Sequence, residues 1–168
     1  MNQAHVVISR VFNAPRNLVW KAWTEAEHLA KWWGPKGFTV SVASFDFRPG
    51  GMFHYSMNGP GGQPMWGKFV YREIVALEKI VFINSFSDPQ GGYTRNPWIP
   101  KWPLEVLNNQ TFTEQAGQTT VTLEGGPINC TPEEEQLFAD NRQNMTIGFK
   151  GTFEQLDELL AALKDGRS

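Results

Sequence analysis

The longest amphipathic pattern in the chain lies near its C-terminus, between residues 131 and 163. From Met145 onward, apolar residues recur at spacings of three and four, which places them in one stripe along a helix, with charged residues on the opposite face. The pattern begins with Thr131, Pro132 and Glu134, a combination of capping residue, first-turn proline and acid that is typical of a helix start. The sequence therefore predicts a long helix that needs a partner for its apolar face.

One uninterrupted helix of about 30 residues would span roughly 45 Å, which is longer than a compact domain of this size needs. Polar residues and two glycines collect between Asp140 and Gly151. We therefore expect a kink or a short break in that stretch. The two parts then have different roles: Leu156–Leu163 holds the helix to its partner, and Met145–Thr152 is the segment that we expect to face a ligand.

The N-terminal part of the chain predicts one strand and two short helices. Ala4–Phe12 is rich in Val and Ile and is typical of a strand, and Pro15 suits the first turn of the helix that follows. Thr24 and Glu27 form the pattern of a second capping box, and the helix that they begin ends before Gly34. Because helices this short are not stable alone, they must pack on a sheet. Their tryptophans are Trp20, Trp23, Trp32 and Trp33.

From residue 38 to residue 124 the pattern consists of strands and turns. The alternation of apolar residues changes phase near Ala43 and Ser44, and because side chains alternate along a strand, this slip indicates a β-bulge and a bent strand. Short links join consecutive strands, which favours an antiparallel meander. The expected strands are Phe38–Phe47, Met52–Met57, Met65–Val75, Ile80–Phe86, Leu104–Glu114 and Gln118–Glu124.

The order of the elements, a strand, two short helices, further strands and a long helix, predicts an α+β fold. With 168 residues, the chain is expected to form a single domain over residues 1–168. The long helix must bury its apolar stripe against one face of the sheet. If the sheet curls, as the bulge indicates, helix and sheet meet at the rims and leave a cavity between them.

The segment 87–103 is the longest irregular one. Glycine and proline deny it regular structure, yet it carries the aromatic residues Tyr93, Trp98 and Trp102. Large apolar side chains in a loop usually fold back over another surface. The composition leaves two interpretations open, a lid over a pocket and a plain connecting loop.

The composition narrows the class of protein. Seven Trp and twelve Phe either fill a thick core or line a cavity, and the order of the elements favours the cavity. A net charge of −2 without any run of Lys and Arg argues against a nucleic-acid or anionic membrane surface. No apolar run reaches the roughly 18 residues of a membrane span, and the first residues have no signal-peptide pattern, so we expect a cytoplasmic protein.

Residues with catalytic or metal-binding chemistry are sparse. The histidines His5, His28 and His54 do not have the spacing of metal ligands, and no nucleotide-binding or nucleophile motif is present, so we expect no metal and no cofactor. Cys130 precedes a helix start, where the helix dipole can lower the pKa of a thiol, but an inert thiol is the simpler interpretation. A single cysteine excludes an internal disulfide and fits a reducing compartment.

His54 is the titratable residue with the strongest claim to a role. It lies in the middle of an expected strand, with Phe53, Tyr55 and Met57 on the opposite face. In a cavity it would be a polar group that orients a ligand or acts as acid and base, whereas on the other face it is an ordinary hydrogen-bonded histidine. Periodicity does not decide which face lines the cavity. The same ambiguity applies to Lys68, Arg72, Asn84 and Asn108.

Several segments, in order along the chain, carry a resemblance to a known family. They are Ala14-Pro15 with Val19–Thr24, His28-Leu29 with Trp32–Pro35, Asp46 with Arg48–Gly51, and Gly148-Phe149 with Leu156. They resemble the homologues of the activator of the heat-shock-protein-90 ATPase, a family of the START-like superfamily, also called SRPBCC or helix-grip. Thr94–Pro97 and Trp102–Glu105 resemble a bacterial single-domain subgroup with the same long loop. The resemblance implies a curved seven-stranded antiparallel sheet wrapped around the C-terminal helix, with a cavity between them.

The leading hypothesis is a non-catalytic protein that binds a small hydrophobic or aromatic molecule, such as a lipid, between the sheet and the C-terminal helix. In this reading Gly148 and Gly151 leave room for the ligand, and the alternative is that they let helix and sheet approach closely. The candidate ligand-binding residues are His54, Trp66, Phe86, Trp98, Trp102, Met145, Gly148, Phe149 and Thr152.

Two other functions stay open at this point. The resemblance implies a chaperone-associated interaction protein as the second hypothesis. The third is a cyclase- or hydrolase-type enzyme that uses a polar cavity residue such as His54. A homodimer through exposed aromatic residues is a further alternative that nothing in the sequence specifies.

Overall fold

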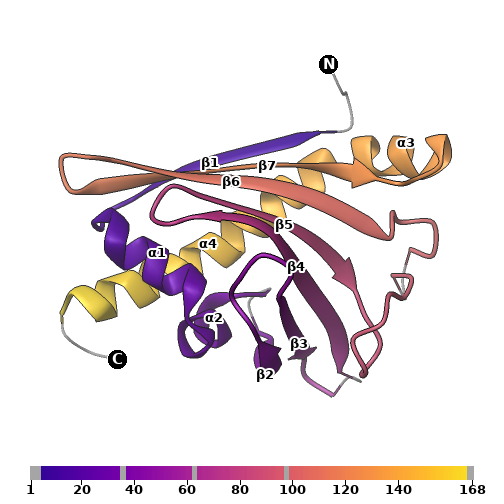
Figure 1. Ribbon diagram of the computed structural model, residues 1–168, viewed down its shortest axis with the longest axis horizontal. Coiled ribbons are helices and arrows are strands. Elements are labelled where there is room, and N and C mark those ends of the chain that lie inside the picture. Colours follow the sequence, from indigo (N-terminus) through magenta and orange to yellow (C-terminus); the bar gives the residue numbers. More distant parts are fainter. Residues whose placement is uncertain (1–4, 35–36, 62–63, 97–98, 166–168) are drawn as a thin grey trace.

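A curved antiparallel sheet and a long helix form the two layers of the structure (Figure 1). The computed structural model describes residues 5–34, 37–61, 64–96 and 99–165. Within these residues the strands are β1 (Val6–Phe12), β2 (Thr39–Phe45), β3 (Met52–Asn58), β4 (Met65–Val75), β5 (Lys79–Phe86), β6 (Glu105–Gln115) and β7 (Gln118–Ile128). The helices are α1 (Arg16–Thr24), α2 (Ala26–Trp32), α3 (Pro132–Asp140) and α4 (Arg142–Lys164).

The sheet is a meander that the first strand completes. Its strand order is β1-β7-β6-β5-β4-β3-β2, so β2 to β7 follow one another as neighbours and β1 pairs with β7, all antiparallel. The prediction of an α+β fold with a seven-stranded antiparallel sheet and a long C-terminal helix is confirmed. We call the face that packs toward α4 the inner face of the sheet, and the opposite one the outer face.

Irregular pairings bend two of the strands. The register of β2 against β3 shifts between Val42 and Ser44, which confirms the β-bulge that the sequence predicts there. A second shift lies between Tyr71 and Glu73 in β4. Bulges increase local twist and bend a strand, and the sheet curls around α4 (Figure 1).

The two short helices pack beside the C-terminal half of α4 (Figure 1). Trp23 of α1 and Trp32 of α2 stack edge to face with ring centroids 4.5 Å apart, and the Trp32 indole N–H donates to the Ala22 carbonyl at 2.9 Å. Phe153 of α4 lies 6.3 Å from Trp23 and 5.6 Å from Phe12 of β1, again between ring centroids. The sequence predicts that these helices pack on the sheet, and they do so. They also pack on α4.

The break predicted in the C-terminal helix is confirmed at Asn141, which separates α3 from α4. The two halves of α4 differ in burial. Leu156 and Leu160 are almost fully buried, whereas in the first turns Met145 and Phe149 are only partly buried and most other residues are exposed. The first half of α4 is therefore less buried than the second, and it reaches the hydrophobic core only through the partly buried side chains of Met145 and Phe149.

Of the two capping boxes that the sequence predicts, the one at Thr131 is confirmed. Its side chain accepts a hydrogen bond from the Glu134 backbone N–H at 3.1 Å, and the Glu134 carboxylate accepts one from the Thr131 N–H at 3.0 Å. The box at Thr24 is wrong, because Thr24 is the last residue of α1 and Glu25 takes the N-cap position of α2 without a side-chain hydrogen bond. α2 thus begins one residue later than the box requires.

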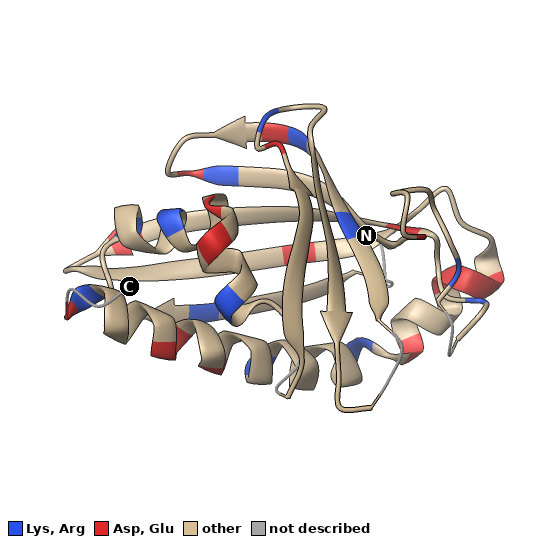
Figure 2. Ribbon diagram, turned by 90° about the horizontal axis from the view of Figure 1, so that it is seen from below, with Lys and Arg blue, Asp and Glu red and all other residues tan. Residues whose placement is uncertain are grey.

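Charged residues of both signs are interspersed over the fold, including along α4 (Figure 2). This distribution accompanies the small net charge of −2. Among the residues that the structure describes, no helix is long and apolar enough to cross a membrane.

Substituting Thr131 tests the capping assignment. Thr131→Ala should lower the free energy of unfolding by about 1 kcal/mol, because it leaves the Glu134 amide in the first turn of α3 without its acceptor. Thr24→Ala, the matched control, should change the free energy of unfolding by less than about 0.5 kcal/mol, as expected for a residue that makes no cap. Urea denaturation followed by circular dichroism measures both, and equal losses would contradict the assignment.

Candidate ligand-binding cavity

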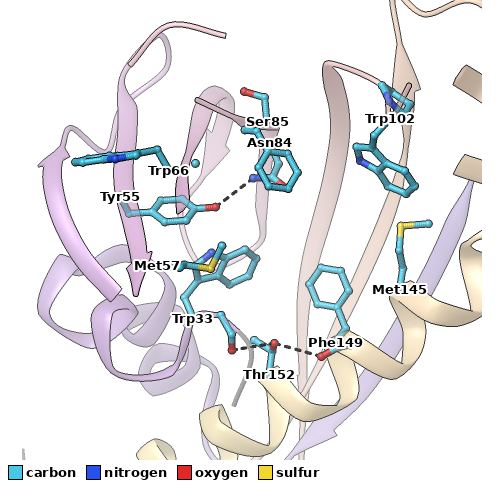
Figure 3. A pocket seen from close by; sticks show the side chains of 15 residues that line it. Trp33, Tyr55, Met57, Trp66, Asn84, Ser85, Trp102, Met145, Phe149 and Thr152 are labelled. Atoms are coloured by element: carbon cyan, nitrogen blue, oxygen red, sulfur yellow. Dashed lines mark hydrogen bonds between the residues drawn. The ribbon is translucent and has the colours of Figure 1, made fainter. Parts of the chain in front are cut away.

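A cavity of about 380 Å³ lies between the inner face of the sheet and the first half of α4 (Figure 3). This volume falls within the roughly 300–1,000 Å³ that is typical of small-molecule sites. The lining is mainly aromatic and apolar. It consists of Trp33, Gly34, Tyr55, Met57, Trp66, Gly67, Asn84, Ser85, Phe86, Trp102, Pro103, Met145, Gly148, Phe149 and Thr152.

One wall of the cavity is a face of α4. Met145, Phe149 and Thr152 follow at spacings of four and three, so their side chains project from the same side of the helix toward the sheet (Figure 3). The Thr152 hydroxyl lies 3.2 Å from each of two carbonyl oxygens, those of Gly34 and Gly148. Gln155, one turn farther on, donates to the same Gly34 carbonyl at 2.7 Å. These bonds tie α4 to the end of α2 just where the cavity begins.

Gly148 leaves open space beside this wall. A Cβ atom built on it would meet no heavy atom within 4 Å, and the same holds for Gly151. Close approach of helix and sheet, the alternative that the sequence leaves open, therefore does not account for either glycine. Of these two glycines, Gly148 lines the cavity and Gly151 does not.

The opposite wall is formed by the strands β3, β4 and β5. Tyr55 pairs with Gly67 in the register of β3 and β4, and Gly67 pairs with Phe86 in that of β4 and β5. The Tyr55 ring extends across β4, and Asn84 of β5 donates to its hydroxyl over a long 3.5 Å (Figure 3). Burial raises the pKa of Tyr55, so the hydroxyl stays protonated at neutral pH.

The end of the long loop closes one side of the cavity. Trp102 and Pro103 line it, and the Trp102 ring centroid lies 5.3 Å from that of Phe138 in α3. Arg95, earlier in the same loop, forms an ion pair with Glu134 of α3. The loop and α3 are thereby linked by one aromatic contact and two charged contacts, the second being the exposed ion pair between Lys101 and Glu133.

Seven of the residues that the sequence nominates lie around this one cavity: Trp66, Phe86, Trp102, Met145, Gly148, Phe149 and Thr152. The side chain of Trp66 shares the outer face with Lys68, two residues along β4, and its ring centroid lies 5.0 Å from that of His54. Trp98 lies outside the described residues. That the seven bind a ligand stays a prediction.

His54 does not line the cavity, in contrast to its nomination from the sequence. Because side chains alternate along β3, Phe53 and Tyr55 occupy the inner face and His54 the outer one, paired with Lys68 of β4. Its Nε2 atom lies 3.1 Å from the Ser87 hydroxyl and 3.2 Å from the Asp88 carbonyl oxygen. His54 is thus a buried histidine that holds the loop, and it is absent from the lining in which an acid or base would act.

The first part of the long loop covers the outer face. Lys68 donates to the Gly91 carbonyl at 2.8 Å, and its ammonium nitrogen lies 3.8 Å from the centroid of the Tyr93 ring. Burial lowers the pKa of Lys68, and the nearby Asp88 and Glu105 carboxylates partly oppose that effect. Neither a simple lid nor a plain loop describes this segment, because its beginning packs on the outer face and its end reaches the cavity.

Two other groups with reactive side chains lie outside the cavity. Burial, followed by the charge of Glu135 and a neighbouring acid, raises the pKa of the Cys130 thiol, so the lowering by a helix dipole does not prevail. In the described part of the chain, Glu25, Glu27 and His28 are the group whose potential metal-ligand atoms lie within 4.8 Å of one another. Exposed acidic residues often gather in this way without a metal ion.

Eight lining residues were not predicted as such from the sequence, although the face of Asn84 was left open: Trp33, Gly34, Tyr55, Met57, Gly67, Asn84, Ser85 and Pro103. The signal for two of them was present, because Phe53, Tyr55 and Met57 share one strand face and three large side chains in a row favour the buried side. Trp33 and Asn84 carry no such signal. Their position follows from strand pairing and from the direction in which α2 ends.

Comparisons with known proteins cover nearly the whole chain. The profile of the family described as Activator of Hsp90 ATPase homolog 1-like protein matches residues 13–161. A protein structure from Mycobacterium smegmatis is 27% identical, has a TM-score of 0.76, and the alignment covers 94% of this chain and 91% of that one. A structure from Staphylococcus epidermidis is 25% identical and has a TM-score of 0.76, and the alignment covers 94% of this chain and 90% of that one. A structure from Arthrobacter aurescens, 24% identical with a TM-score of 0.78 and coverage of 95% and 87%, shares the fold. Among curated proteins the chain has no match.

The link between the loop and α3 predicts a response to acid. Hydrogen bonding from the Thr131 N–H, and then from Arg95, lowers the pKa of Glu134 below its ordinary 4.5. The unfolded chain therefore binds this proton more readily, so the stabilisation is complete above pH 4.5 and is lost as the pH falls below it. Glu134→Gln keeps a capping side chain but not the charge, and its melting temperature should depend less on pH than that of the unsubstituted protein between about pH 5 and 3.

Glu133→Gln is the control for this experiment. Glu133 is exposed and pairs only with the exposed Lys101 among the ion pairs found in the described residues, at 2.8 Å. Its replacement should leave the pH dependence of the melting temperature nearly unchanged. The same flattening in both variants would show that Glu134 has no special part in acid stability.

Proposed function

This chain belongs to the family of Activator of Hsp90 ATPase homolog 1-like proteins, and we propose that it binds a small hydrophobic or aromatic molecule in the cavity between the sheet and α4, without catalysis. The observation that carries the proposal is the state of α4. In its first half, the apolar side chains of Met145 and Phe149 are only partly buried against the core, and both line the cavity. Apolar groups that fill such a space stabilise a protein. A cavity that the protein's own side chains leave unfilled therefore favours the binding of a ligand.

The hydrophobic effect supplies the driving force for such binding. Each 100 Å² of apolar surface that a ligand covers contributes roughly 2.5 kcal/mol. The aromatic rings of Trp33, Phe86 and Phe149 offer surfaces on which flat or branched apolar molecules can lie. After the cost of association is subtracted, a ligand of moderate size is expected to bind with a dissociation constant in the range of about 1–100 μM.

The composition of the lining favours binding over catalysis. Within the described residues, the lining contains no Asp, Glu, His, Lys or Arg. General acid–base catalysis needs a group that exchanges its proton near the operating pH. Tyr55, whose pKa is raised by burial, does not do so, and His54 lies on the outer face. A cyclase- or hydrolase-type activity therefore has less support than binding.

A chaperone-associated role is the alternative that the family description brings with it. It predicts that the protein stimulates the ATPase of a chaperone and does so equally well when the cavity is filled by mutation. Since the cavity has no part in that role, the two functions are separable by experiment. For the location, we propose the cytoplasm, whose reducing conditions suit the free thiol of Cys130.

Tryptophan fluorescence tests the proposal directly, because Trp33 and Trp102 line the cavity. The protein is titrated with a panel of fatty acids, apolar ketones and polycyclic aromatic compounds. We expect saturable changes in emission with at least one class. A complete lack of saturable binding, together with stimulation of a chaperone ATPase, would replace this proposal by the alternative.

Filling the cavity from α4 gives the sharpest variant. Gly148→Leu places a side chain in open space that borders the cavity, so the affinity for any ligand found above should fall about tenfold or more. The fold should not suffer, since replacing a helical glycine adds up to about 1 kcal/mol of stability.

Gly151→Leu is the matched control. It makes the same change in the same helix, also meets no heavy atom within 4 Å, and lies outside the cavity lining. This variant should gain similar stability and keep the affinity of the unsubstituted protein. Equal affinity in both variants would contradict the placement of the ligand beside Gly148.

A further inference from the structure

One polar group stands out in the apolar cavity, the hydroxyl of Tyr55. Its position depends on the glycine opposite. Tyr55 and Gly67 are paired residues of β3 and β4, and a Cβ atom on Gly67 would lie 2.7 Å from the Tyr55 hydroxyl oxygen. Only a glycine lets the ring pass over β4 and carry its hydroxyl to the middle of the sheet wall, next to Asn84 of β5 (Figure 3).

The orientation of the Asn84 amide is fixed by the main chain. Its Nδ2 atom lies 3.2 Å from the carbonyl oxygen of Lys68, and only the nitrogen side of an amide can donate to a carbonyl. The same nitrogen faces the Tyr55 hydroxyl at 3.5 Å. The amide therefore donates to Tyr55 and cannot accept its proton.

The second partner of Tyr55 is also a donor. The Trp33 side chain lowers the pKa of Tyr55 in the way that a donor to its hydroxyl does, and an indole N–H can only donate. Both neighbouring groups therefore favour the hydroxyl oxygen as an acceptor. Among the hydrogen bonds of the described residues, none takes the proton of Tyr55, so this proton is left to donate to something else.

The other polar side chains around the cavity are less suited to meet a ligand. The Thr152 hydroxyl is already bonded to the Gly34 and Gly148 carbonyls. Ser85 pairs with Lys68 in the register, which assigns its side chain to the outer face. No cationic side chain belongs to the described lining, so a carboxylate ligand would lose its hydration without gaining a counter-charge.

We propose that the cavity selects neutral apolar molecules that carry one hydrogen-bond acceptor, such as the carbonyl oxygen of a ketone or ester, and that Tyr55 donates to this oxygen. The inference rests on the proposed binding function and adds the chemical class of the ligand. An unmade hydrogen bond in an apolar site is unfavourable, so a ligand with an acceptor at this position binds better than its hydrocarbon counterpart.

A set of three probes of one shape tests the selectivity. Acetylnaphthalene carries a ketone, ethylnaphthalene is its hydrocarbon counterpart, and naphthoate carries a charged carboxylate. Equilibrium dialysis against the full chain measures each dissociation constant. We expect the ketone to bind about tenfold more tightly than the hydrocarbon, in line with one net neutral hydrogen bond, and naphthoate to bind most weakly.

Tyr55→Phe removes the donor and keeps the ring. It should weaken acetylnaphthalene about tenfold and leave ethylnaphthalene within about twofold. Tyr71→Phe is the matched control, because Tyr71 is also a buried inner-face tyrosine, its hydroxyl has no partner in the described residues, and it lies outside the lining. It should change neither constant. Thermal unfolding of both variants checks that the fold is retained.

The outcomes separate the two proposals. If ketone and hydrocarbon bind the unsubstituted protein equally well, or Tyr55→Phe weakens both alike, the selection by Tyr55 is overturned while the binding function stands. Tightest binding of naphthoate would also overturn it. If none of the three probes and no member of the larger panel binds saturably, the binding function itself fails.

Discussion

The aromatic packing around Phe153 is the constraint on which the rest of the structure depends. This one ring, almost fully buried, contacts Phe12 of β1, Trp23 of α1 and Trp32 of α2, and so joins the first strand, both short helices and α4. Aromatic rings in a close-packed interior cannot be compressed, so they fix the smallest distance between the helix and the sheet as well as joining them. The distance between α4 and the sheet is therefore set at the C-terminal half of the helix.

The cavity is a consequence of that fixed distance. A straight helix held at one end cannot follow a sheet whose strands are bent by bulges, as β2 and β4 are. The hydrogen bonds from Thr152 and Gln155 to the Gly34 carbonyl mark the point on α4 where the cavity begins. Beyond it, toward Met145, the cavity lies between helix and sheet.

The two faces of the sheet serve different ends because side chains alternate along every strand. On β3 and β4, the inner face carries the aromatic rings of Tyr55 and Phe69, while the outer face carries His54 and Lys68 beneath the loop. A titratable cluster and an apolar cavity thus lie back to back. The chemistry available to a ligand is that of the inner face alone, which is why one tyrosine hydroxyl matters there.

The sequence by itself determined the local features: the apolar stripe of the last helix, its break near Asn141, the cap at Thr131 and the phase change at Ser44. Each depends on residues close together in the chain, whose spacing fixes their geometry. The false box at Thr24 shows the limit, since α1 ran on through the residue that would have capped α2.

Tertiary structure decided which strand face became the wall of the cavity, and with it the places of His54 and Tyr55. On β4 and β5 both faces carry apolar residues, so periodicity alone is symmetric between them, and only β3, with Phe53, Tyr55 and Met57 on one side, favoured a face. The pairing of Tyr55 with Gly67, and its reach to Asn84, join residues of three strands. Such contacts depend on register and curvature, which belong to the whole sheet and are not encoded in the spacing of neighbouring residues.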